Sequence, residues 1–280
     1  MKNIFLSILM VLIYFIGFGQ TNRVIYINKE KPKVSNSRYV FKSIAIIYGG
    51  TIDPNNDGTV NYLNIEKFIV SKFPNKNDVG IFCIDLENQL YKDLRDRAIN
   101  SKRFINAENH FLNILKLCKK LRPNVKIGFY GIPFKTLSRY NIDQSRIDKI
   151  IKISDVIFPS LYLNFSNSEN KGLDKNYSHI DINLRETLKL AVKYNKLVIP
   201  FTWYMVHPYN KSWGTQILDK ISYVNYIERI FTFSFEGRSI NGIVYWDPMT
   251  KNYEKYKKKD HNNKFRNYSQ DDIFHYYYNR

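Results

Sequence analysis

Cysteine is scarce in this sequence: its 280 residues include only two, Cys83 and Cys118. Disulfides therefore do not hold this fold together, as they do in many small secreted proteins. Cys83 falls in a predicted strand and Cys118 on a predicted helix, which favours two buried, small apolar side chains over a bridge or a metal site. The five histidines show no metal-ligand spacing. We expect neither a bound metal nor an organic cofactor.

The signatures of several other function classes are also missing. No glycine-rich phosphate-binding fingerprint follows the first predicted strand, which weakens a dinucleotide-binding interpretation. No nucleophile elbow is present, which argues against Ser-His-Asp chemistry. The segment "DPNNDG" at 53–58 resembles the start of a calcium loop but lacks the twelve-residue pattern that ends in Glu.

Long hydrophobic runs are confined to the first twenty residues, "MKNIFLSILMVLIYFIGFGQ". A Lys near the start, an apolar run and small residues before a polar flank predict a secretory signal peptide at 1–20. A retained membrane anchor is the alternative, because the run approaches the length that spans a bilayer. We expect an exported protein, periplasmic or extracellular, with no stable membrane anchor once the signal peptide is cleaved.

Acidic residues are outnumbered, since 43 Lys and Arg face 25 Asp and Glu and the formal net charge is +18. Attraction to an acidic polymer is one interpretation of this charge. A general bias toward Lys, Asn, Ile, Tyr and Phe is the other, because scattered surface lysines need no partner. Export argues against nucleic acid, so an anionic polysaccharide or a bacterial surface is the partner that the charge would suit.

Strand-like apolar runs alternate with helical patterns along the chain. The predicted strands are 43–50, 79–87, 126–133, 156–163, 196–205 and 240–248. The predicted helices between them are 61–73, 108–121, 145–155, 182–195 and 215–233. The strands lack the alternation of a sheet with one wet face, so they predict parallel strands covered by helices.

Four segments follow from this pattern. After the signal peptide at 1–20, residues 21–42 are polar and basic and form a leader. Residues 43–250 form a single α/β domain, because the chain that remains after cleavage, about 260 residues, is long enough for one large core. Residues 251–280 are a basic, Tyr-rich tail that either packs as a last helix or stays mobile.

Polar and aromatic side chains gather at the ends of the predicted strands. They are Asp85, Glu87, Tyr130, Tyr162, Trp203, Tyr204, Trp246 and Asp247. In a (β/α) barrel these ends converge on the face that carries active sites, which favours a barrel over an open doubly wound sheet. Six strands fall short of eight, so the predicted fold class is α/β, an irregular or incomplete (β/α) TIM-type barrel.

The two acids Asp85 and Glu87 lie two residues apart in the strand "VGIFCIDLE" and so point to the same face as Cys83. Two carboxyl groups held close in a partly dry site cannot both ionise freely, so one pKa rises. A carboxylic acid beside a carboxylate cleaves glycosidic bonds, and aromatic side chains offer flat faces to sugar rings. The competing interpretations are a helix N-cap or a salt-bridged pair for the acids, and core packing for the aromatics.

Five motifs carry a resemblance to a known family: "IDLEN", "LRPNVKIGFYGIP", "DVIFPSLYL", "LRETLKLAVKYNKLVIPFTWYMVHPY" and "INGIVYWD". In order and rough spacing they resemble the motifs of the hyaluronidase-type glycoside hydrolases, family 56, over residues 43–248. The resemblance implies a hydrolase in which Glu87 is the proton donor. Asp85 would orient the substrate's own acetamido group, whose oxygen attacks the anomeric carbon.

The resemblance also implies roles for the aromatic residues. Tyr162 matches a tyrosine that hydrogen-bonds the acetamido group, and Trp246 matches the aromatic residue that lines the same subsite. Tyr130 and Tyr204 match further aromatic positions. With Trp203 and Asp247 they complete the expected substrate-binding set.

Some motifs depart from the family pattern. Asn88, Gln89 and Leu90 replace its further acid and Trp, and "IPFK" at 132–135 replaces its "FPDC". The resemblance and the positive charge together imply an N-acetylhexosamine-containing, anionic, hyaluronan-like glycan as the substrate. These departures leave chondroitin or a bacterial wall polymer as alternatives. A non-catalytic carbohydrate-binding protein on the same barrel and a basic surface-interaction module remain open. His207 follows a strand end, but we expect it to face solvent.

Overall fold

The computed structural model describes residues 23–28, 34, 38–135, 143–247, 265 and 267–279. The predicted signal peptide and much of the predicted tail lie outside the described residues. No helix in the described ranges is long and apolar enough to cross a membrane.

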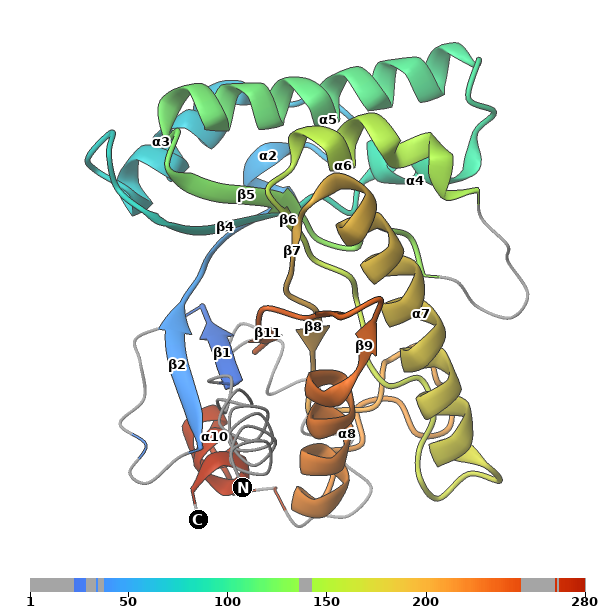
Figure 1. The fold of residues 1–280 in the computed structure, drawn as a ribbon. Coiled ribbons are helices and arrows are strands. Elements are labelled where there is room, and N and C mark those ends of the chain that lie inside the picture. Colours follow the sequence, from blue (N-terminus) through green and yellow to red (C-terminus); the bar gives the residue numbers. More distant parts are fainter. Residues whose placement is uncertain are drawn as a thin grey trace, which may run out of the picture.

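Parallel strands form the centre of the molecule (Figure 1). In chain order they are β1 Arg23–Ile27, β2 Tyr39–Ser43, β3 Ala45–Tyr48, β4 Gly80–Asp85, β5 Val125–Phe129, β6 Val156–Ile157, β7 Leu197–Val198, β8 Phe201–Thr202 and β11 Ile243–Tyr245. One sheet has the order β2-β1-β11-β8, another β3-β4-β5, and β6 pairs with β7. Each of the six predicted strands overlaps at least one of these strands.

The sheets succeed one another around a barrel. β2 and β3 are two halves of one segment: β2 pairs with β1, and β3 pairs with β4. On the other side, single parallel bridges join Tyr130 to Phe158 and Ser160 to Phe201. These interruptions leave the barrel without a continuous closed sheet, which confirms the predicted irregular (β/α) barrel.

The prediction that residues 21–42 form a polar leader is wrong for its two strands. β1 lies between β2 and β11 in parallel register, with Ile25 opposite Phe41 and Ile243. Ile25 and Ile27 are fully buried. The run "RVIYI" is only five residues long and borders polar sequence, so it does not stand out from its neighbours. The domain therefore begins before residue 43.

The domain also extends past residue 250. Helix α10, Gln270–Tyr278, begins with a capping box between Ser269 and Asp272. It packs on the outside of the barrel, where the hydroxyl of Tyr277 donates to the carbonyl of Leu218 at 2.6 Å. The tail was expected either to pack as a last helix or to stay mobile, and residues Gln270–Tyr278 form the packed helix.

Helices surround the strands (Figure 1). They are α2 Gly49–Ile52, α3 Tyr62–Lys72, α4 Gln89–Asp96, α5 Lys102–Leu121, η1 Gln144–Ile147, α6 Asp148–Ile153, α7 Gly172–Tyr194 and α8 Lys220–Thr232. All five predicted helices are present, and α5 and α7 begin earlier than predicted. A small antiparallel hairpin, β9 Ser234–Phe235 and β10 Arg238–Ser239, precedes β11.

Strand β4 shows how the core places the site. Phe82 and Ile84 are buried in the cluster beneath α3 and α5, whereas Cys83 belongs to the cluster that includes the barrel aromatics. The alternation of side chains along a strand then directs Asp85 to the same side as Cys83. Cys83 and Cys118 are both buried and free, as predicted.

Candidate active site

The acid pair lies where β4 passes into α4. The strand ends at Asp85, and Asn88 caps the helix by accepting hydrogen bonds from the backbone N–H groups of Leu90 at 3.0 Å and Tyr91 at 3.4 Å. The capping interpretation of the two acids is therefore excluded, because Asn88 is the cap. Within the described residues neither Asp85 nor Glu87 forms an ion pair within 4.0 Å.

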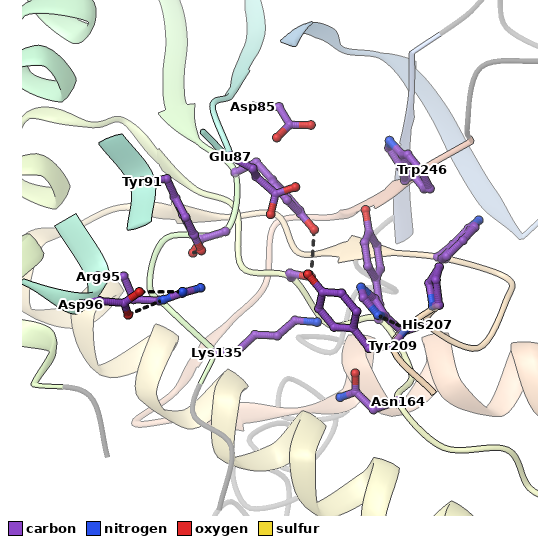
Figure 2. A pocket seen from close by; sticks show the side chains of 16 residues that line it. Asp85, Glu87, Tyr91, Arg95, Asp96, Lys135, Asn164, His207, Tyr209 and Trp246 are labelled. Carbon is purple, nitrogen blue, oxygen red and sulfur yellow. Dashed lines mark hydrogen bonds and ion pairs between the residues drawn. The ribbon is translucent and has the colours of Figure 1, made fainter. Parts of the chain in front are cut away.

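A pocket of about 820 Å³ opens at this end of the barrel (Figure 2). Its lining comes from the segments that follow β4, β5, β6, β8 and β11. The lining residues are Asp85, Glu87, Tyr91, Arg95, Asp96, Tyr130, Gly131, Lys135, Ser160, Tyr162, Asn164, Trp203, His207, Pro208, Tyr209 and Trp246. Six of the eight predicted site residues are among them.

The two exceptions are Tyr204 and Asp247, whose predicted place in the pocket is wrong. Tyr204, which follows β8, is fully buried away from the pocket, with its ring stacked on Tyr245 at 5.5 Å. Asp247 accepts hydrogen bonds from the Tyr204 hydroxyl at 3.3 Å and from Gln270 Nε2 at 2.7 Å. Adjacent residues point to opposite sides of an extended chain, so Trp203 faces the pocket and Tyr204 the outer core.

Aromatic rings form one wall of the pocket. The centroids of Trp203 and Trp246 are 5.0 Å apart with the rings nearly perpendicular, and Tyr162 lies 5.8 Å from Trp203 and 5.9 Å from Trp246. Tyr130 stands behind Tyr162 at 6.2 Å and donates a hydrogen bond to Ser160 Oγ at 3.1 Å. Rings that pack against each other hold one another's orientation, so this wall offers fixed apolar faces.

Two cations share the pocket with the acids. The Lys135 ammonium lies 5.5 Å from the centroid of Tyr162, and Figure 2 shows its side chain extending into the space below Glu87. Arg95 lies on α4 and forms a bidentate pair with Asp96 at 2.7 and 2.8 Å. Lys135 forms no ion pair within 4.0 Å among the described residues.

Burial shifts both acids toward their protonated forms, and the charge of Glu87 adds to the shift of Asp85. The pKa of Asp85 is raised to about 8, first because the carboxyl is buried and second because Glu87 is close. Burial also raises the pKa of Glu87, whereas the charges of Lys135 and Arg95 act to lower it. The pair therefore retains a proton at neutral pH, and its two carboxyls titrate as a unit.

Lys135 shows the converse effect. Burial lowers its pKa to about 8, and attraction to Glu87 opposes that change. A cation that is partly desolvated interacts strongly with any anion that enters the same space.

The structure corrects the expectation for His207, which lines the pocket. Its ring is stacked near Tyr162 at 6.0 Å with 28° between the planes, and burial lowers its pKa to about 4. Sequence reasoning also missed Lys135, Asn164 and Tyr209. All of them lie on loops after strand ends, where neither strand nor helix periodicity identifies a facing side. Their positions just past those ends were the available signal.

A buried hydrogen-bond network fixes the segment that follows the acid pair. Asp53 is buried, and its carboxylate accepts from the backbone N–H groups of Asp57 at 3.1 Å and Gly58 at 2.9 Å. It also accepts from Asn88 Nδ2 at 2.7 Å, next to Glu87 in the chain. The loop "DPNNDG" thus holds the side chain of Asn88, the N-cap of α4, through Asp53. Within the described ranges, no cluster of His, Cys, Asp or Glu is placed to hold a metal ion.

The fold of this irregular parallel barrel is similar to that of solved hyaluronidase structures. Two crystal structures of bee venom hyaluronidase match the chain. One, a monoclinic form, matches with a TM-score of 0.60 and 16% identity over 85% of this chain and 98% of that one. The other, a complex with a hyaluronic acid tetramer, matches with a TM-score of 0.59 and 17% identity over 85% and 97%.

These matches confirm the resemblance predicted from the motifs, at the level of the fold. No family model matches the sequence, and no curated protein matches it.

Proposed function

We propose that the protein is a glycoside hydrolase that cleaves an N-acetylhexosamine-containing, anionic glycan by substrate-assisted, retaining hydrolysis. The observation that carries the proposal is the pair Asp85 and Glu87, which lines a pocket with an aromatic wall, has raised pKa values and forms no ion pair among the described residues. Holding two carboxyls close together without a paired cation costs free energy, and cleavage of a glycosidic bond is a reaction that uses such a pair.

In the first step the carbonyl oxygen of the substrate's acetamido group attacks the anomeric carbon. The bond to the leaving glycosidic oxygen breaks as Glu87 gives that oxygen its proton. The ionised carboxylate of Asp85 accepts the acetamido N–H and stabilises the positive charge of the cyclic intermediate. The raised pKa values keep one proton on the pair at neutral pH, with Asp85 as its holder in the free protein; the mechanism requires this proton to pass to Glu87 when the substrate binds, which leaves Asp85 ionised.

In the second step water attacks the anomeric carbon from the side that the leaving group vacated. Glu87, now a carboxylate, takes a proton from that water, and the acetamido group is restored. Two inversions at one carbon give net retention. Tyr162 would hydrogen-bond the acetamido oxygen, while Trp246 and Trp203 pack against the sugar. Tyr130 positions Tyr162 from behind.

The anionic character of the substrate is supported by two features. The net charge of +18 favours the approach of a polyanion, and Lys135 extends into the pocket. A protein with this fold has been crystallised with a hyaluronic acid tetramer. Hyaluronan is therefore the first glycan to test. The N-terminal apolar run supports an exported protein, periplasmic or extracellular, acting on a polysaccharide outside the cytoplasm.

The test compares the wild-type protein, Glu87→Gln and the exposed control Glu66→Gln on hyaluronan, chondroitin and a chitin oligomer. New reducing ends and the absorbance of unsaturated products are followed. We expect saturated reducing ends from the wild type and Glu66→Gln, and a loss of turnover of at least about a thousandfold in Glu87→Gln with binding retained.

Three outcomes would contradict this function. Full activity in Glu87→Gln would end the mechanism. Binding without products from any glycan would indicate a carbohydrate-binding protein or an untested bacterial wall polymer. Binding that disappears when Lys257, Lys258 and Lys259 are replaced by Gln but is unaffected by Glu87→Gln would indicate a basic surface module.

A further inference from the structure

Tyr91 lines the pocket but has no part in the bond-breaking steps of the proposed reaction. It lies in the first turn of α4, four residues after Glu87. In Figure 2 Tyr91 and Arg95 lie on one side of Glu87, and Lys135 lies below it. Tyr91 is therefore close to the acid pair and to both cations of the pocket.

The hydroxyl of Tyr91 joins α4 to the loop that follows β5. It donates a hydrogen bond to the carbonyl of Gly131 at 2.9 Å. The approach is close, since a Cβ atom added to Gly131 would lie 3.0 Å from the Tyr91 oxygen. The φ angle of Gly131 is +71°, a left-handed conformation that glycine adopts without strain. Glycine at this position thus lets the loop backbone reach the hydroxyl.

The ring of Tyr91 makes a second contact with the same loop. It lies edge-on to Phe134, with 5.2 Å between the ring centroids and 77° between the planes. Phe134 is buried and directly precedes Lys135. One polar and one aromatic contact therefore hold the loop that carries Lys135 against the helix that follows Glu87.

The position of Lys135 matters because its charge acts on Glu87. Burial raises the pKa of Glu87, and the charges of Lys135 and Arg95 act to lower it. The energy between two charges falls as their distance grows, so a displaced Lys135 has less effect. Arg95 is held separately, by its bidentate pair with Asp96 and by the face of the Tyr91 ring, 5.8 Å from its guanidinium carbon.

Other titratable groups also face Glu87 and Lys135. Burial, and then the charge of Glu87, raise the pKa of the Tyr91 hydroxyl, so this group remains a donor throughout the pH range of the reaction. The remaining groups are Asp85 on β4, Tyr130 after β5, Tyr162 after β6, His207 after β8 and, interacting with Lys135, His179 on α7. Lys135 is the group that lies on the segment held by Tyr91.

We propose that Tyr91 is a positioning residue, which holds Lys135 at a fixed distance from Glu87. The hydroxyl acts through Gly131 and the ring through Phe134. This inference rests on the proposed function. It adds that a contact between α4 and the loop after β5 determines the pH range over which the acid pair keeps its proton.

The test compares the pH–rate profiles of the wild type, Tyr91→Phe, Lys135→Met and the double variant. Tyr91→Phe removes the hydroxyl but keeps the ring, so Arg95 keeps its contact. We expect the alkaline limb of Tyr91→Phe to move to higher pH by about 0.3 to 0.5 unit, because a less firmly held Lys135 lowers the pKa of Glu87 by less. The double variant should have the alkaline limb of Lys135→Met, since the hydroxyl acts through Lys135.

Tyr62→Phe is the matched control. The hydroxyl of Tyr62 is hydrogen-bonded to His110 Nδ1 at 2.9 Å, and neither residue lines the pocket. Its alkaline limb should coincide with that of the wild type. A Tyr91→Phe variant that loses stability in urea unfolding while its alkaline limb stays in place would show a purely structural role and refute the proposal.

Failure of the positioning role and failure of the proposed function give different results. If the wild type cleaves a glycan but the alkaline limb of Tyr91→Phe does not move, or the shifts of the two single variants add in the double variant, the role of Tyr91 is refuted. If the wild type cleaves no glycan, the hydrolase fails, and NMR titration of carbon-13-labelled Glu carboxyls decides the role of Tyr91. The signal of Glu87 is assigned with Glu87→Gln. Equal pKa values of Glu87 in the wild type and Tyr91→Phe would refute the role, and a higher value in Tyr91→Phe would support it.

Discussion

Replacing Asp85 with Asn should stabilise the protein at pH 8 while it impairs catalysis. Burial and Glu87 raise the pKa of Asp85 from 3.8 to about 8. The folded protein therefore holds a proton that the unfolded chain has already lost between pH 4 and 8. Stability contributed by the neutral acid is complete below pH 4 and declines as the pH rises through this window.

The size of the effect follows from the shift. A shift of about four units corresponds to about 5 kcal/mol of unfolding free energy lost by pH 8, at 1.36 kcal/mol per unit. Asn has no proton to lose, so the variant escapes this penalty, although its amide still has to be accommodated in the buried site. We expect the advantage of Asp85→Asn over wild type to grow by about 3.5 kcal/mol between pH 5 and pH 8.

Urea unfolding followed by tryptophan fluorescence at pH 5, 6.5 and 8 would measure this difference. Asp174→Asn, an exposed substitution on α7, is the control and should show no comparable growth with pH. A variant whose stability relative to wild type stays constant across the three pH values would refute the argument. Turnover measured on the same samples should fall severely, since a neutral amide in place of the Asp85 carboxylate cannot supply a negative charge to the acetamido group.

Two further changes probe the surroundings of the acid pair. Lys135→Met should raise the pKa of Glu87, because the charge of Lys135 acts to lower it. The alkaline limb of the pH–rate profile should therefore move to higher pH by about half a unit to one unit. An alkaline limb at the same pH as in the wild type would contradict this. Asp53→Ala leaves the Asn88 amide and two backbone donors without their acceptor, and should cost about 2–4 kcal/mol in urea unfolding and lower kcat; unchanged stability would count against the network.

The alternation of apolar runs and helical patterns in the sequence predicted the strands correctly where the apolar runs were long. The segments 43–50 and 79–87 contain β3 and β4, because uninterrupted β-branched and aromatic residues mark strands buried on both faces. The five residues of β1 carry the same chemistry, but so short a run beside polar sequence is indistinguishable from a leader. Its role is defined only by β2 and β11, its neighbours in the barrel.

A site residue could be predicted from the sequence only where the pattern showed which side of its strand the side chain faces. Asp85 and Glu87 are two apart, so placing one places the other. Trp203 and Tyr204 are adjacent residues directly after the two-residue strand β8, and the sequence does not say which of the two faces the pocket. Lys135 and Tyr209 lie on loops whose course is determined by tertiary hydrogen bonds, so no local pattern could place them.

The acid pair marks the point where the demands of folding and of the proposed chemistry diverge. An apolar side chain at Asp85 would suit the barrel interior, since Cys83 and Tyr130 nearby are buried. The chain instead places two carboxyls there and surrounds them with fixed supports, the Asn88 cap and the Asp53 network. Those supports add stability close to where the acids remove it. Two acids at the end of an otherwise apolar strand do not fit the pattern of a buried strand. This departure is the feature of the sequence that indicates a functional site.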